Sequence, residues 1–137
     1  MVIVDTTVWV DYLHGMQNQE TEWLDREVGQ EEIGLTDLIL CEVLQGVRRD
    51  DEYFRVRTLL GEFEVLETGG EELCVAAAEN YRKLRKRGRT VRKTIDCLIA
   101  TFCIGNGHSL LHRDNDFRHF EELLGLTVIH PKPPSIS

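Results

Sequence analysis

Four acidic residues of the chain lie inside or directly beside apolar segments. Asp5 ends the run "VIVD", Glu42 interrupts "LILCEVL", Asp96 lies within "TIDCLIA", and Asp114 follows "LLHR". Because an ionised carboxylate without a partner is unfavourable in apolar surroundings, such acids are generally ion-paired, hydrogen-bonded or bound to a metal ion. Asp116 follows close behind Asp114, although a turn needs at most one aspartate. It is therefore either a solvated turn residue or a further member of one site.

A shared site for these acids would have the chemistry of a hard metal ion. Converging carboxylates repel one another, and their pKa values rise unless a cation lies between them. Oxygen ligands favour Mg²⁺ or Mn²⁺ over zinc. One or two such ions can activate a water molecule and stabilise the charge on a phosphate, as in many nucleases. The sequence offers no evident side-chain nucleophile beside the acids, so an activated water is the expected attacking group.

Each acid also has a purely structural explanation. Asp5 could cap a helix that begins near Thr7, and Asp96 could complement a helix dipole. Asp114 could open a turn, and Glu42 could pair with an arginine. A common site explains all four together, provided that the elements carrying them bring them to one place.

Those elements follow from the apolar pattern, which alternates between short strand-like runs and longer helical ones. The pattern predicts strands at 2–5, 32–36, 63–67, 109–113 and 126–130, and helices at 7–15, 21–29, 37–47, 51–61, 71–87 and 95–105. Such alternation predicts an α/β fold with a mainly parallel sheet covered by helices on both faces.

This fold would collect the acids at one edge of the sheet. Asp5 and Asp114 fall at the carboxyl ends of two predicted strands, and ligands of open parallel sheets bind at this edge, where the strand order reverses. Asp96 begins the helix that leads into the second of these strands. Glu42 lies in a helix that is apolar on most faces and is expected to be mostly buried, and it could project into the same crevice.

Half of the basic residues are concentrated in one segment. Residues 82–93, "RKLRKRGRTVRK", hold eight of the sixteen basic residues and no acid, although the net charge of the chain is −8. Such a basic strip can neutralise the phosphates of a nucleic acid at close range. The alternative is an ordinary solvated helix end.

Length and composition bound the class of protein. The 137 residues suit one domain, predicted over residues 1–130 and followed by a Pro-rich tail at 131–137. No apolar run is long enough to span a membrane and the N-terminus lacks the pattern of a secretory signal, so a cytoplasmic protein is expected. The four cysteines lie in apolar segments without metal-binding spacing and are predicted to be buried thiols: Cys41, Cys74, Cys97 and Cys103.

Four segments in this order resemble a known family. The stretches "MVIVDTTVWVDYL", "LILCEVLQG", "RGRTVRKTIDCLIA" and "LLHRDNDF" are similar to the motifs of the PIN-domain ribonucleases, specifically the VapC-type toxins of bacterial VapBC toxin-antitoxin systems. The resemblance runs from Met1 to the vicinity of Ile129. It implies a three-layer α/β/α sandwich, endoribonuclease activity on RNA that depends on Mg²⁺ or Mn²⁺, inhibition by a VapB-type antitoxin, and a homodimer.

The resemblance also implies roles for single residues. The acidic quartet of the family is matched by Asp5, Glu42, Asp96 and Asp114. Three of these would bind the ion directly or through its waters, while Glu42 would bind a second ion or take the proton from the attacking water. Asp116 matches an additional acid often found two residues on. It would either support the metal site, by reaching a second ion or the metal's waters, or only fix the turn before Phe117.

Other residues would assist the acids. Thr7 stands where the family has a hydroxyl near the metal's water, whereas His112 is expected to be structural rather than a ligand. RNA phosphates would be held beside the site by four residues of the basic strip: Arg87, Arg89, Arg92 and Lys93.

Two other classes of function remain open at this point. A phosphatase or phosphotransferase could use Asp5 as its nucleophile, but the haloacid-dehalogenase pattern needs an aspartate where Thr7 stands, and the chain has no G-x-x-x-x-G-K-[ST] phosphate loop. A non-catalytic PIN-like module could use the basic strip to bind RNA or a protein. Specific Mn²⁺ binding that is lost on Asp5→Asn would separate a working site from such a scaffold.

Overall fold

Five short parallel strands organise the chain. The computed structural model describes residues 1–133, and its strands are β1 (Val2–Val4), β2 (Ile33–Thr36), β3 (Glu64–Leu66), β4 (Ser109–Leu111) and β5 (Thr127–Val128). They lie in the order β3-β2-β1-β4-β5, and every neighbouring pair is parallel. The mainly parallel sheet predicted from the alternating pattern is confirmed.

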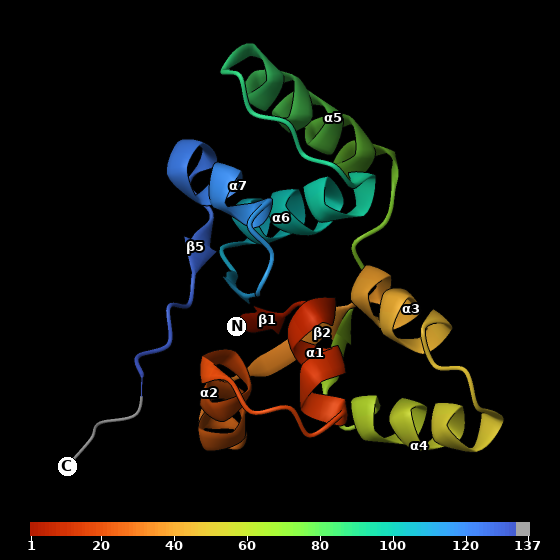
Figure 1. Cartoon of the computed structure of the whole chain (residues 1–137). Helices are drawn as coiled ribbons and strands as arrows, with labels where there is room; N and C mark the ends of the chain where they lie inside the picture. The colour runs from red at the N-terminus through yellow and green to blue at the C-terminus, as the bar shows by residue number, and fades with distance from the viewer. Residues whose placement is uncertain (134–137) are drawn as a thin grey trace.

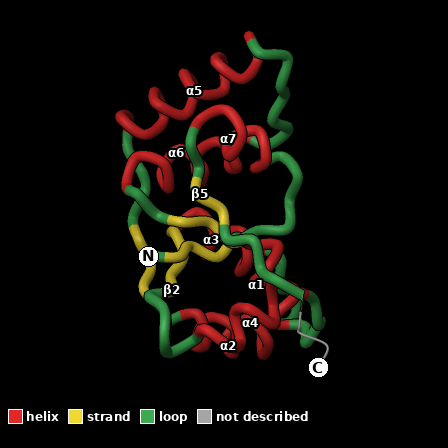
Figure 2. The backbone as a smooth tube through the Cα atoms, turned by 90° about the vertical axis from the view of Figure 1, so that its left-hand side faces the viewer, coloured by secondary structure: helices red, strands yellow, loops and turns green. Residues whose placement is uncertain are grey.

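Seven helices surround the sheet in the described part of the chain. They are α1 (Thr6–Leu13), α2 (Gln19–Glu27), α3 (Asp37–Gln45), α4 (Asp50–Leu60), α5 (Glu71–Lys86), α6 (Thr94–Asn106) and α7 (Phe117–Leu124). Figures 1 and 2 show α5, α6 and α7 on one side of the sheet and α1, α2 and α4 on the other. Helix α3 lies beyond the carboxyl ends of the strands and contacts both α1 and α6. The three-layer arrangement is thus confirmed, with α3 closing one edge.

The strand order reverses between β1 and β4. From β1 the chain builds outward through β2 to β3, and it then returns to place β4 on the other side of β1. Val4 is paired with Leu111, and the backbone N–H of Asp5 donates to the carbonyl oxygen of Leu111 at 2.9 Å. The segments that follow β1 and β4 therefore leave the sheet side by side, which is where an open parallel sheet forms its ligand crevice.

The core fills both spaces between the layers. Ile3 and Val4 of β1 are fully buried, as is Trp9 of α1, whose ring packs edge-on against Phe63 with centroids 4.9 Å apart. Helix α6, which is apolar on most faces, is buried along most of its length. Burial of each large apolar side chain contributes about 1.5 to 3 kcal/mol. The site acids are thus mounted on strands and helices that the core holds rigidly.

Helix α7 is not among the elements predicted from the sequence. Its residues Phe117 and Phe120, one turn apart, are fully buried, whereas Arg118 and Glu122 are exposed. Gly125 ends the helix with a φ of +79°, and strand β5 shrinks to two residues within the predicted 126–130. The pattern is an amphipathic helix of only two turns, a length at which helical periodicity is hard to separate from loop.

Helix α3 is less buried than its composition suggests. Only Ile39 and Val43 are buried, and Leu38, Leu40 and Leu44 are only partly covered. The prediction that α3 is mostly buried is therefore wrong, because the helix lies beyond the carboxyl ends of the strands and leaves the side that carries Cys41 exposed.

The prediction of four buried thiols is correct for only half of the cysteines. Cys97 and Cys103 of α6 are buried, but Cys41 and Cys74 are exposed, and all four are free. Cys41 lies on the open face of α3, and Cys74 on α5, which packs over α6 as an outer helix. Burial raises the pKa of Cys97 to about 11 and that of Cys103 to about 12.

This difference predicts the reactivity of the thiols. In the native protein at pH 8, a disulfide reagent is expected to modify Cys41 and Cys74 within minutes and to leave Cys97 and Cys103 unmodified, because thiolate and access are both needed. Spectrophotometric titration with and without denaturant checks this. All four thiols should react after unfolding; equal reactivity in the native state would contradict the assigned burial.

Two further predictions from the sequence concern the C-terminal tail and a membrane-spanning helix. Residues 134–137, the last part of the predicted Pro-rich tail, lie outside the described residues. Among residues 1–133, no helix combines the length and the apolar character that crossing a bilayer demands.

Candidate active site

Asp5 is a buried acid at the carboxyl end of β1. It is the N-cap of α1, and its Oδ2 accepts hydrogen bonds from the Thr7 backbone N–H at 3.3 Å and from the Thr7 hydroxyl at 2.9 Å. Burial raises the pKa of Asp5 to about 6, although the Thr7 hydrogen bonds oppose this and the charge of Glu42 adds to it. The helix-cap role considered from the sequence is real, but it occupies only one carboxylate oxygen and does not neutralise the group.

Asp96 lies in the first turn of α6 and is only 4% exposed. Its Oδ2 is buried and has no hydrogen-bond partner among the described residues. Burial raises the pKa of Asp96 to about 7, and the negative charges of Asp5, Asp114 and Glu42 raise it further, in that order, while Lys93 lowers it. Since each of these acids acts on Asp96, all four lie close enough to interact through their charges.

Glu42 reaches the acids from α3. Its Oε1 accepts a hydrogen bond from the hydroxyl of Thr6 at 2.7 Å, so the first turn of α1 holds the side chain in place. Its charge raises the pKa of both Asp5 and Asp96. Glu42 therefore faces the crevice, whereas an ion pair with an arginine, the structural alternative, does not form within residues 1–133.

Asp114 is positioned by the loop after β4. Its backbone N–H donates to Nδ1 of His112 at 3.1 Å, and its Oδ1 accepts from the Asp116 backbone N–H at 2.9 Å. The His112 ring lies against Phe117 with centroids 4.9 Å apart, and burial lowers the pKa of His112 to about 4. In this structure His112 supports the loop that carries Asp114.

Asp116 is buried and connects two segments that are distant in sequence. Its Oδ2 accepts hydrogen bonds from Nε and from the backbone N–H of Arg92 at 3.1 and 3.2 Å. It makes no side-chain cap for α7. The hydrogen bond to Asp116 raises the pKa of Arg92, and the charges of Asp116, Asp114 and Asp96 raise it further, so this arginine lies at the border of the acid cluster. Asp116 is thus no solvated turn residue.

Thr7 and Arg113 join the ends of β1 and β4. The Thr7 hydroxyl donates to Asp5 and accepts from the backbone N–H of Arg113 at 3.2 Å. The Arg113 guanidinium in turn donates from Nη1 to Asp11 of α1 at 2.6 Å. Hydrogen bonds of this kind fix the orientation of carboxylates that bind metals. Thr7 is therefore placed to orient Asp5.

The predicted RNA-binding residues of the basic strip lie in different surroundings. Arg92 and Lys93 border the acids, as their effects on Asp116 and Asp96 show. Arg89 instead donates from Nη1 to Glu122 of α7 at 2.9 Å and lies 3.1 Å from His119. Arg87 is exposed at the end of α5. Of the four predicted RNA-binding residues, two lie beside the acids and one is ion-paired with α7, and their contacts with RNA stay predictions.

The acid cluster fits a hard cation that keeps part of its water. Within residues 1–133, no three histidine, cysteine, aspartate or glutamate side chains surround one point closely enough to hold an ion alone. The buried, unpartnered Oδ2 of Asp96 and the raised pKa values of Asp5 and Asp96 nevertheless indicate a missing positive charge. Mg²⁺ commonly binds through one or two carboxylates and several waters. The residues present therefore suit such an ion.

Two contributors to the site were missed by sequence reasoning. Thr6 positions Glu42, and Arg113 holds the Asp114 loop against α1. Each has its partner 36 or more residues away. The only signal in the sequence is that both adjoin a candidate acid, and it is too weak to assign a role.

Comparisons with known proteins agree with this arrangement. The model of the PIN-domain family matches residues 2–123. Ribonuclease VapC11 of Mycobacterium tuberculosis is 32% identical over 119 residues, which cover 85% of this chain and 89% of the relative. The chain belongs to the VapC ribonucleases of the PIN-domain family.

Solved structures of this family share the fold. VapBC2 from Rickettsia felis, crystallised with a DNA fragment from its promoter, superimposes with a TM-score of 0.75 at 16% identity, covering 94% of this chain and 98% of that chain. FitAcB from Neisseria gonorrhoeae gives a TM-score of 0.75 at 17% identity, covering 96% and 98%. The VapC resemblance of the four sequence motifs is confirmed, and the phosphatase alternative has no support.

Proposed function

We propose that this VapC-type protein is an endoribonuclease that depends on Mg²⁺ or Mn²⁺ and acts as the toxin of a toxin-antitoxin pair. The observation that carries the proposal is the convergence of Asp5, Asp96, Asp114 and Glu42 at the switch point of the sheet, with an unpartnered carboxylate oxygen on Asp96. Membership of a ribonuclease family makes RNA the expected substrate.

In the proposed mechanism, Asp5, Asp96 and Asp114 would hold the ion directly or through its waters. When bound, the ion supplies an activated water and neutralises the charge that develops on the phosphate. Thr7 keeps Asp5 oriented, and Glu42, held by Thr6, is available to accept the proton of the attacking water. Lys93 and Arg92 border the acids and can bind the phosphates on either side of the cut.

The test is cleavage of a single-stranded RNA by the purified chain, freed of any partner. Cleavage is expected with Mg²⁺ or Mn²⁺ and not with excess EDTA. Mapping of RNA ends after brief induction in cells identifies the target. Undiminished cleavage in EDTA would overturn the metal-dependent mechanism.

Asp114 and Asp116 are expected to differ in importance. We expect Asp114→Asn to lower kcat/KM by at least about a hundredfold, because even residues that only support metal ligands contribute about 10- to 100-fold. Asp116→Asn should cost about tenfold, because it loses the charge that holds Arg92. Steady-state cleavage of one RNA checks both.

The variant Arg92→Ala is the control for this difference. If Asp116 acts only through Arg92, the kcat/KM of the double variant Asp116→Asn/Arg92→Ala should not fall below that of the less active single variant. Additive losses would instead support a direct role of Asp116 at the metal.

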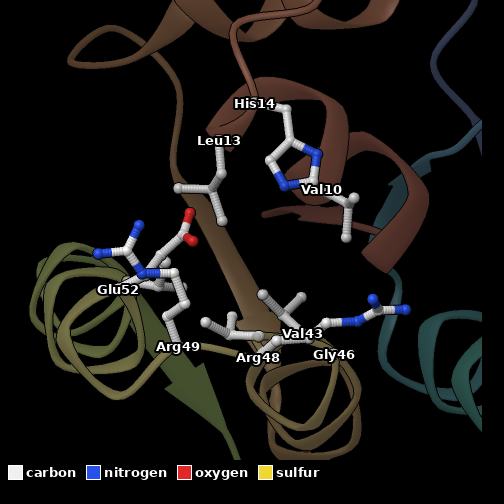
Figure 3. A pocket seen from close by; sticks show the side chains of 10 residues that line it. Val10, Leu13, His14, Val43, Gly46, Arg48, Arg49 and Glu52 are labelled. Atoms are coloured by element: carbon white, nitrogen blue, oxygen red, sulfur yellow. The ribbon is translucent and has the colours of Figure 1, made fainter.

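A VapB-type antitoxin is the partner that we propose. Several solved relatives are toxin-antitoxin complexes. In this chain a recess of about 460 Å³ lies between α1, α3 and α4, where Val10 and Leu13 face Val43 across the opening and Arg48 and Arg49 stand at the rim (Figure 3). Val10, Leu13 and Val43 give the recess an apolar lining, and Arg48 at its rim has no ion-pair partner among residues 1–133, whereas Arg49 pairs with Asp51 at 2.8 Å. An apolar segment with an acidic flank would therefore fit it.

Co-expression with an adjacent small open reading frame tests the partner. A complex should form and growth arrest should be relieved, and Leu13→Glu in the recess should weaken the complex while Val75→Glu on α5 should not. If no complex forms and growth is not restored, the toxin role fails, whereas the nuclease role is unaffected. The homodimer, the boundary at residue 130 and the cytoplasmic location stay predictions, and sedimentation of the purified chain tests the first.

A further inference from the structure

A recess of about 330 Å³ lies directly beside Asp114 and differs from the antitoxin recess. The N-terminal end of α2, the loop from β4 to α7, helix α7 and the segment after β5 form its walls. Asp114 belongs both to its wall and to the acid cluster. A molecule bound in the recess would therefore touch whatever is held at the acids.

Most charges around the recess are already paired. Arg113 binds Asp11 at 2.6 Å, and its Nε lies 3.7 Å from Glu20. Such pairs leave little net charge in their part of the wall.

One cation of the recess remains available. Glu121 binds His130 at 2.6 Å, whereas the guanidinium of Arg118 is exposed and has no ion-pair or hydrogen-bond partner among residues 1–133. A free guanidinium beside paired neighbours is a ready site for a phosphate, which it can bind with two hydrogen bonds.

The wall also carries unused hydrogen-bonding groups. The side-chain amides of Gln19 and Asn115 are exposed and make no hydrogen bond within the described residues. The ring of His112 contributes a further hydrogen-bonding group. Its Nδ1 accepts from the backbone N–H of Asp114, so the proton of the neutral ring must sit on Nε2. That Nε2 is buried and has no acceptor in the described chain. A buried donor without an acceptor is rare and indicates a missing partner.

Apolar surface completes the recess. Val128 and Ile129 are half-buried and line the same wall. Proteins bind single-stranded RNA with cations on the backbone, with hydrogen bonds to base edges, and by stacking bases on aromatic or arginine planes. Val128 and Ile129 offer a base apolar contact rather than such a plane. Two amides, a free guanidinium and an apolar pair beside the acid cluster supply base-edge hydrogen bonds, a phosphate contact and an apolar wall.

We propose that this recess binds one nucleotide of single-stranded RNA next to the scissile phosphate. Arg118 binds the backbone phosphate, and Gln19 and Asn115 contact the base against Val128 and Ile129. This inference rests on the proposed ribonuclease function and deepens it, because it places the nucleotide preference in the recess rather than at the acids.

The first arm of the test measures binding without cleavage. A fluorescent single-stranded tetranucleotide is titrated against Asp96→Asn, which should not cut, and against the same chain carrying Arg118→Ala. Loss of one charge-assisted contact should weaken binding about tenfold. The slope of log K against log salt concentration should fall by about 0.7 for one lost phosphate contact. Arg26→Ala, an exposed arginine in the last turn of α2, is the matched control and should change neither value.

The second arm measures specificity with the full site present. Oligonucleotides that differ only in the nucleotide beside the cut are cleaved by the wild type and by Gln19→Ala/Asn115→Ala. The ratio of kcat/KM between the best and worst nucleotide should fall at least about threefold in the double variant, while the poorest substrate is little affected. Both residues are exposed, so circular dichroism should show an unchanged fold.

The outcomes separate the recess from the catalytic function. Normal cleavage by the wild type together with unchanged RNA binding by Arg118→Ala and unchanged preference in the double variant would overturn the recess and leave the nuclease standing. Weaker binding by Arg118→Ala in a chain that never cleaves RNA would support the recess as an RNA-binding site but overturn both the nuclease and the placement beside a scissile phosphate. Absence of both cleavage and RNA binding would overturn both.

Discussion

Replacing Asp96 by asparagine is expected to abolish most RNA cleavage while making the ion-free protein more stable above pH 7. Cleavage should fall by more than about a hundredfold, because the loss of residues that merely support a ligand already costs about 10- to 100-fold. The stability change has the opposite sign because the carboxylate is buried, and its Oδ2 has no partner in the described chain. Asparagine removes the charge and keeps the shape.

The sign follows from the proton equilibrium of Asp96. Its pKa is about 7 in the folded protein and 3.8 for an unperturbed aspartate side chain. The folded state therefore holds a proton that the unfolded state releases between these values. The stability that this bound proton contributes to the folded state is complete below about pH 4 and is lost as pH rises through 7. Without metal, the wild type should lose on the order of 2 kcal/mol over this range, since residual hydration screens part of the shift.

Urea unfolding in EDTA at pH 4.5 and pH 8 measures this difference. Asp96→Asn should show a smaller loss of stability between the two pH values than the wild type. Glu79→Gln, at an exposed acid of α5, is the control and should keep the wild-type dependence. A variant that retains the full pH dependence, or that cleaves RNA normally, would contradict the assignment of Asp96.

Adding Mg²⁺ or Mn²⁺ should stabilise the wild type, and more strongly at pH 8 than at pH 5.5. An ion at a hundred times its Kd adds about 2.7 kcal/mol, which corresponds to about 10 °C in Tm for a chain of this length. At pH 5.5 the ion must displace protons from Asp5 and Asp96, whose pKa values are about 6 and 7. At pH 8 both carboxylates are ionised, so no proton opposes the ion.

Thermal unfolding with increasing Mn²⁺ at both pH values checks this prediction. The variant Asp5→Asn/Asp96→Asn serves as the control and should show no specific shift at either pH. An equal shift in this variant would mean that the ion binds elsewhere. A shift that is larger at pH 5.5 would mean that the acids are not its ligands.

The amino-acid sequence by itself singles out Asp5, Asp96, Asp114 and Glu42, because each of them interrupts an apolar run or lies at the end of one. Local periodicity also places Asp5 and Asp114 after strands, and parallel strands end at one edge of a sheet. The fold class and the four acids thus follow from short-range patterns. Such patterns are local and do not depend on which residues, distant in sequence, come into contact in the folded chain.

Contacts between distant segments are decided only by the folded chain. Asp116 holds Arg92 across 24 residues, and Thr6 holds Glu42 across 36. Arg89, whose RNA contact stays a prediction, forms an ion pair with Glu122 of α7, a helix too short for its two turns of periodicity to predict. The open face of α3 and the exposed Cys41 likewise follow from the position of α3 at the edge of the sheet. An apolar residue in the sequence indicates a tendency to be buried. How many faces of its helix are covered by other elements depends on how the layers pack.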